Sequence, residues 1–116
     1  MAGPHKQPHQ RGKPVRSIDV HAHLGQARKL RTLRPSIDDL IHAMDLLGVN
    51  IAAVSAIPAV MGGVVRYNDS TVDAVKRFPD RIFGYMCVNV AYPHEAEREL
   101  RRCLDAGLRG IKVHSG

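Results

Sequence analysis

Two histidines separated by a single residue lie near the start of the chain, in the stretch SIDVHAHLG. This stretch is a predicted strand, on which His21 and His23 share one face with Asp19. The side chains of the two histidines then leave the backbone at points roughly 6.5–7 Å apart. Two imidazoles at that spacing can reach one divalent metal ion at about 2.0–2.1 Å each. The alternative is a pair of polar residues at a strand end, and the motif alone leaves both open. We expect Asp19 to be a hydrogen-bonding carboxylate, not a ligand.

A second polar pair lies in the stretch LRGIKVH, close to the other end of the sequence. Lys112 and His114 alternate with apolar residues, so they share one face of a strand predicted over 108–114. Parallel strands end at the same edge of a sheet, and the active sites of (β/α)8 barrels lie at that edge. Lys112 and His114 are therefore candidate site residues, with a solvated strand end as the alternative.

Alternating strands and helices must position these residues. Ser36 and Asp39 have the spacing of a capping box, and Gly48 supplies a left-handed stop for the first helix. Asn68 or Asp69 is the expected cap of the second helix, and Pro93 opens the third. Strands are predicted over 16–24, 49–58, 81–90 and 108–114, and helices over 36–47, 68–78 and 93–106.

This β-α-β-α-β-α-β order implies parallel strands joined by right-handed crossovers. Both an open doubly wound sheet and part of a barrel fit it. No G-x-G-x-x-G follows the first strand, so dinucleotide binding has no support. The sequence ends on a strand, where half a barrel would end. We therefore predict an α/β fold, a partial TIM (β/α)8 barrel with about four parallel strands and three helices over residues 16–116.

The positive charge of the chain is concentrated in its first third. Residues 1–34 hold eight of the 17 Lys and Arg residues against one acid, whereas the remainder is nearly balanced. We expect residues 1–15 to be a disordered basic leader, because they have almost nothing to bury. Nucleic-acid binding through this leader is not expected, since no aromatic residue is interleaved with the charges.

Composition argues for an ordinary globular protein. Hydrophobic residues make up 44% of the chain and charged residues 24%. No apolar run approaches ~18 residues, and no secretory signal is visible, so we expect a cytoplasmic protein with no membrane partner. Cys87 and Cys103 form no C-x-x-C pair, and we expect both to be buried thiols.

Three stretches of the sequence, taken in order, resemble a known enzyme family. IDVHAHLG resembles the metal-binding signature of the amidohydrolase superfamily. YNDSTVDAVKRFPDRIFGYMCVNV and EAERELRRCLDAGLRGIKVHSG resemble its amidohydrolase-related branch, amidohydrolase 2, which includes aminocarboxymuconate semialdehyde decarboxylase-like enzymes. Other families with the H-x-H motif, such as TatD-like nucleases, are less similar in the Phe-Pro-Asp-Arg and Gly-Ile-Lys-x-His stretches.

The resemblance implies a metal-dependent hydrolase or decarboxylase that acts on a small carboxylic acid or a lactone-type substrate. The metal would be bound by His21 and His23, with zinc expected and manganese as the alternative. Lys112 and His114 are carried over only as candidate catalytic residues. The family completes its metal site with a histidine on the fifth strand and an aspartate on the eighth, and this sequence has neither strand.

We therefore expect an N-terminal half that is weakly active or inactive by itself. The alternative is a non-catalytic half-barrel that assembles with itself as a homo-oligomer or with a complementing C-terminal half. An uncovered fourth strand would be an open sheet edge, which favours pairing with another chain.

Overall fold

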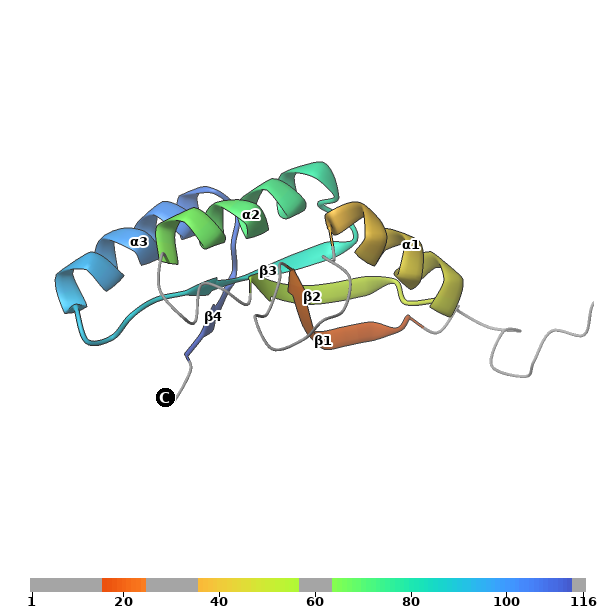
Figure 1. The fold of residues 1–116 in the computed structure, drawn as a ribbon, viewed down its shortest axis with the longest axis horizontal. Helices are drawn as coiled ribbons and strands as arrows, with labels where there is room; N and C mark the ends of the chain where they lie inside the picture. Colours follow the sequence, from red (N-terminus) through yellow and green to blue (C-terminus); the bar gives the residue numbers. More distant parts are fainter. Residues whose placement is uncertain (1–15, 25–35, 57–63, 114–116) are drawn as a thin grey trace, which may run out of the picture.

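The computed structural model describes residues 16–24, 36–56 and 64–113, which form one sheet and one layer of helices. The four strands are parallel and lie in the order β1-β2-β3-β4, and the three helices lie along one side of the sheet (Figure 1). This confirms the predicted partial (β/α)8 barrel. The elements are β1 (Ile18–Leu24), α1 (Ile37–Leu47), β2 (Ile51–Ala56), α2 (Val64–Arg77), β3 (Ile82–Cys87), α3 (Pro93–Asp105) and β4 (Gly110–Lys112).

Local signals set the ends of α1 as the sequence predicts. The Ser36 hydroxyl accepts a hydrogen bond from the N–H of Asp39, and the Asp39 carboxylate accepts one from the N–H of Ser36. Gly48 ends the helix in the left-handed conformation, with φ of 72°. None of the three helices in the described part of the chain is long and apolar enough to cross a membrane.

Helix α2 begins earlier than predicted. The sequence pattern placed its start at Asn68, but the helix begins at Val64, and Asn68 is fully buried within it. The prediction was wrong because the Asn68 carboxamide does not cap its own helix. It bonds instead to the backbone of Cys87 in β3, a contact 19 residues away. The predicted leader over 1–15 and the candidate His114 lie outside the described residues.

The core lies between the sheet and the helices. Cys87 and Cys103 are both buried and unpaired, as predicted. One cluster joins β1, β2 and β3 to the first two helices, and a smaller cluster joins β3 to α2 and α3. The buried members of the larger cluster are Ala22, Leu24, Ile37, Met44, Ala52, Val54, Ala74 and Ile82.

Strand β1 contains an irregularity beside the histidines. From Asp19 to Ala22, β1 has one residue more than the facing segment of β2, which marks a β-bulge. Asp19 therefore pairs with Ala52, a residue of the helix-covered core, whereas His23 lies on the opposite, open face. The prediction that Asp19 shares a face with the histidines was wrong, because it assumed unbroken alternation along the strand.

Gly84 of β3 has no room for a side chain. A Cβ atom there would lie 2.9 Å from Cγ2 of Val75 and 3.1 Å from Cγ2 of Thr71, and it would also overlap Leu108. We expect Gly84→Ala to lower the free energy of unfolding by about 1–3 kcal/mol through overpacking, as measured by urea denaturation. A loss below about 0.5 kcal/mol would contradict this close packing of α2 against β3.

Candidate metal centre

The side chains of His21 and His23 converge on the open face of the sheet. Their Nε2 atoms lie 2.8 Å apart, and their rings meet nearly edge to face at 78°. At this separation the two nitrogens are within hydrogen-bond distance of each other. A tetrahedral ion bound at 2.0–2.1 Å to each would place them about 3.3 Å apart. A separation larger by about 0.5 Å would therefore let both Nε2 atoms bind one divalent ion.

The second ring nitrogen of His23 is fixed by the neighbouring strand. Nδ1 of His23 lies 3.3 Å from the carbonyl oxygen of Ser55 and 3.2 Å from its hydroxyl. A carbonyl can only accept, so a proton on Nδ1 satisfies this contact and leaves Nε2 with the lone pair that a metal requires. This pattern, a metal-facing nitrogen opposite a hydrogen-bonded one, is typical of histidine ligands in metal sites.

The surroundings of His23 favour its neutral form. Burial lowers its pKa from the ordinary value of 6.5, and the positive charge of Lys112 lowers this pKa further. Lys112 pairs in register with Cys87, which places it on the same face of the sheet as His23. The sheet thus brings a cation onto the same face as the histidine pair, from a strand about 90 residues later in the chain.

Asp19 and Asn89 make local hydrogen bonds with the backbone. The Asp19 carboxylate accepts a hydrogen bond from the N–H of His21, as expected for a hydrogen-bonding carboxylate. The Asn89 side chain accepts one from the N–H of Ala91, which is typical of a turn. Within residues 16–24, 36–56 and 64–113, no group of three or more His, Cys, Asp and Glu side chains is placed to hold a metal ion.

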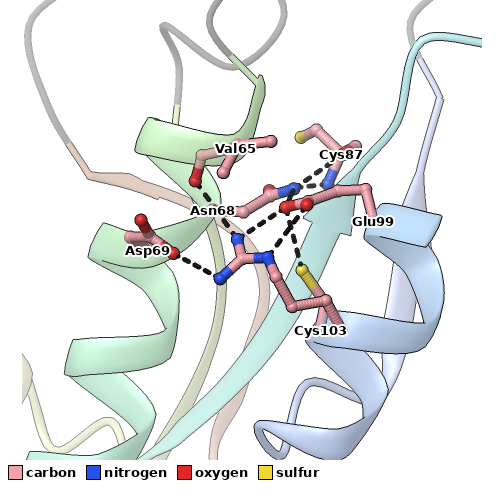
Figure 2. A network of polar contacts seen from close by, with 7 residues as sticks. Val65, Asn68, Asp69, Cys87, Glu99 and Cys103 are labelled. Carbon is pink, nitrogen blue, oxygen red and sulfur yellow. Dashed lines mark hydrogen bonds and ion pairs between the residues drawn. The ribbon is translucent and has the colours of Figure 1, made fainter. Parts of the chain in front are cut away.

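A buried polar network, which the sequence did not predict, holds the end of β3 (Figure 2). Asn68 donates to the carbonyl oxygen of Cys87 at 2.8 Å and accepts from its N–H at 2.9 Å. The side chain thus binds both peptide groups of Cys87 as a neighbouring strand would. The same amide nitrogen of Asn68 donates to Glu99 at 3.0 Å, which links α2 to α3.

Glu99 is the charged centre of this network and is only 6% exposed. Arg102 donates to both of its carboxylate oxygens, at 2.7 and 2.9 Å, and also to Asp69 at 2.6 Å. The hydrogen bonds from Arg102 hold the pKa of Glu99 below its ordinary value, against the effect of burial. The thiol of Cys103 donates to Glu99 as well, so the carboxylate is fully satisfied.

Two of these unpredicted contacts had a weak signal in the sequence. Ser55 is the only polar residue in β2, IAAVSA, and a lone hydroxyl in an apolar strand calls for a buried partner. Asn68 stands near the predicted start of a helix, where a capping role was the simpler interpretation. No local pattern indicated that its partner would be a strand.

Comparisons with known proteins match the fold and one family. A family described as amidohydrolase matches residues 18–116. The structure resembles 2,6-dihydroxybenzoate decarboxylase from Rhizobium, with a TM-score of 0.69, 22% identity, and coverage of 86% of this chain and 38% of that one. No curated protein matched the sequence.

Two further solved structures are similar. For 5-carboxyvanillate decarboxylase from Novosphingobium aromaticivorans, with bound manganese and 3-methoxy-4-hydroxy-5-nitrobenzoic acid, the TM-score is 0.75 at 19% identity, covering 96% of this chain and 44% of that one. For a probable 2-pyrone-4,6-dicarboxylic acid hydrolase from Acinetobacter baumannii, the TM-score is 0.59 at 20% identity. This match covers 84% of this chain and 37% of that one. The chain therefore spans less than half the length of these proteins, and the likeness shows their fold.

Proposed function

Because this chain belongs to the amidohydrolase family, we propose that it is part of a metal-dependent hydrolase or decarboxylase. The substrate would be a small carboxylic acid or a lactone-type compound. The similar solved structures include two named decarboxylases and one probable hydrolase of dicarboxylic acids, which supports this range of reactions. Substrate and reaction type belong to the whole enzyme, of which this chain is less than half by comparison with those structures.

The convergence of the two Nε2 atoms is the observation that carries the proposal. His21 and His23 would hold a divalent ion, and the Ser55 carbonyl keeps the Nε2 atom of His23 free to bind it. A divalent metal bound there acts as a Lewis acid toward a carbonyl or carboxylate oxygen. We expect zinc, with manganese as the alternative, since two imidazoles suit either ion.

The position of Lys112 on the face of the sheet that carries the histidines supports a role in binding the acidic part of a substrate. Its charge is close enough to lower the pKa of His23, so an anion near the metal pair would also lie near this ammonium. We propose that Lys112 orients a substrate carboxylate, as a flexible point charge with three donors. His114, two residues further along the chain, remains a candidate for a similar role.

The pair of imidazoles supplies only two ligands, and a catalytic zinc site usually has three protein ligands. We propose that the remaining ligands come from further strands of the barrel. The chain by itself is then expected to be weakly active or inactive, even when it binds a metal. Calorimetric titration with Zn²⁺ and with Mn²⁺ tests the proposal, and absence of binding for both ions would contradict it.

The second candidate function is assembly, which the exposed apolar side chains favour. Val20 and Phe83 are 67% and 39% exposed, and Val20 lies in the bulged segment of β1. Ile111 of β4 and Val113, directly after this strand, are exposed as well. In the described sheet β4 pairs with β3 alone. Four further strands would close an eight-stranded barrel, so we propose a second four-stranded unit as the partner.

A second copy of the chain is the partner that can be tested directly. We expect sedimentation equilibrium to show a dimer whose fraction increases with concentration. Charges at the open edge, introduced as Ile111→Lys with Val113→Lys, should shift the dissociation constant at least about tenfold toward monomer. Glu97→Lys on the exposed face of α3 is the control. A strictly monomeric chain would exclude self-assembly.

A further inference from the structure

Tyr85 of β3 reaches across the sheet to the strand that carries the histidines. Its hydroxyl donates a hydrogen bond to the carbonyl oxygen of Val20 in β1, at 3.3 Å, although β2 lies between the two strands. Since Val54 pairs with Gly84, Tyr85 stands beside Ser55 on the open face of the sheet. Tyr85 therefore lies next to Ser55, whose carbonyl and hydroxyl oxygens contact His23.

The acceptor of this hydrogen bond belongs to the β-bulge. Val20 and His21 are the two residues of β1 that together face one residue of β2. A bulge interrupts the regular ladder and changes the direction of nearby side chains. The direction of His21 thus depends on the conformation of the bulge. Within the described residues, the His21 ring contacts His23 but makes no hydrogen bond to a neighbouring strand.

Two neighbours hold the tyrosine ring in place. Phe83 meets it edge to face, with ring centroids 5.5 Å apart. Gly110 of β4 lies directly against the ring, so that a Cβ atom there would be 2.7 Å from Cε1 of Tyr85 and closer still to Cδ1. The absence of a side chain at Gly110 is what allows the ring to lie flat along the sheet.

We propose that Tyr85 is a positioning residue for the metal pair, acting through the bulge. Its hydroxyl fixes the peptide between Val20 and His21 and so aims the His21 ring at His23. This inference rests on the proposed function, since it concerns the same two ligands. Among the described residues, Tyr85 makes no hydrogen bond to either imidazole, so its effect on the metal is indirect.

The test replaces the hydroxyl and keeps the ring. We expect Tyr85→Phe in the full chain to weaken Zn²⁺ binding by about three- to tenfold, at or below the usual effect of residues that orient metal ligands. The free energy of unfolding in urea should stay nearly unchanged, because the hydroxyl is exposed. The absorption spectrum of bound Co²⁺ should also change in the variant, since the angle between the two imidazoles is no longer fixed.

Two controls separate the inference from its premise. Tyr92→Phe removes the hydroxyl of another exposed tyrosine, at the start of α3, and it should leave Zn²⁺ affinity within about twofold of the unaltered chain. His23→Ala should remove binding. Binding that survives His23→Ala would overturn the proposed metal pair itself. Loss in His23→Ala with normal affinity in Tyr85→Phe would overturn only the positioning role, as would equal losses in Tyr85→Phe and Tyr92→Phe.

Discussion

Replacing His23 with alanine is expected to weaken binding of Zn²⁺ or Mn²⁺ by about 100-fold or more. The chain offers the ion two imidazole nitrogens, and one alone leaves mostly water in the coordination shell. His21→Ala should have an effect of similar size, because the two Nε2 atoms lie on either side of the same position. Isothermal titration calorimetry of each variant measures the change directly.

His42→Ala is the matched control, because His42 is an exposed histidine on α1 and lies on the helical side of the fold. Its variant should bind the metal as the unaltered chain does. If His21→Ala and His23→Ala titrate like His42→Ala, the two histidines are not the ligands. Urea denaturation of all three variants shows whether a lost heat signal reflects lost ligands or a lost fold.

Arg102→Ala is expected to lower the free energy of unfolding by about 2–3 kcal/mol. The substitution leaves the Glu99 carboxylate buried without its counter-ion. An uncompensated buried charge is strongly destabilising. The loss should be smaller than for a fully buried pair, because the Arg102 side chain is 41% exposed. Urea denaturation at pH 7 measures the difference.

Arg101→Ala, one residue earlier on the same helix, is the control. Arg101 pairs with Glu97 in the open, and both side chains are more than half exposed. Its removal should cost at most about 0.5 kcal/mol, as for other exposed pairs. Glu99→Gln added to Arg102→Ala should restore part of the stability, since no uncompensated charge then remains. Equal losses for Arg101→Ala and Arg102→Ala would contradict the role assigned to the network.

The same ion pair predicts how stability depends on pH. Arg102 holds the pKa of Glu99 below its ordinary value of 4.5 in the folded chain. In acid, Glu99 therefore binds a proton more readily in the unfolded chain than in the folded one. The contribution of the ion pair to the free energy of unfolding is complete above about pH 4.5, and it is lost as the pH falls through the pKa of Glu99 in the folded chain. The stability difference between the unaltered chain and Arg102→Ala should accordingly shrink as the pH is lowered below 4.5.

Much of the fold was predictable because its signals are local. The capping box of Ser36 and Asp39 and the stop at Gly48 involve residues a few positions apart, and α3 begins at Pro93 as expected. Apolar runs between these helices identify the strands, and the βα alternation then permits only parallel pairing. The start of α2 was misplaced, because the partner of Asn68 lies on a distant strand. The end of β3 was misplaced as well, since this strand ends at Cys87 and not at residue 90.

The sequence by itself determined the two histidines, their spacing, and the edge of the sheet at which they lie. Only the tertiary structure decided how they are aimed. Ser55 fixes the ring of His23 from 32 residues away, and Tyr85 reaches the bulge beside His21 from 65 residues away. The bulge itself arises from pairing with β2 and breaks the alternation that the sequence implied. Contacts at such separations leave no periodic trace, because each depends on the register between strands that are far apart in the sequence.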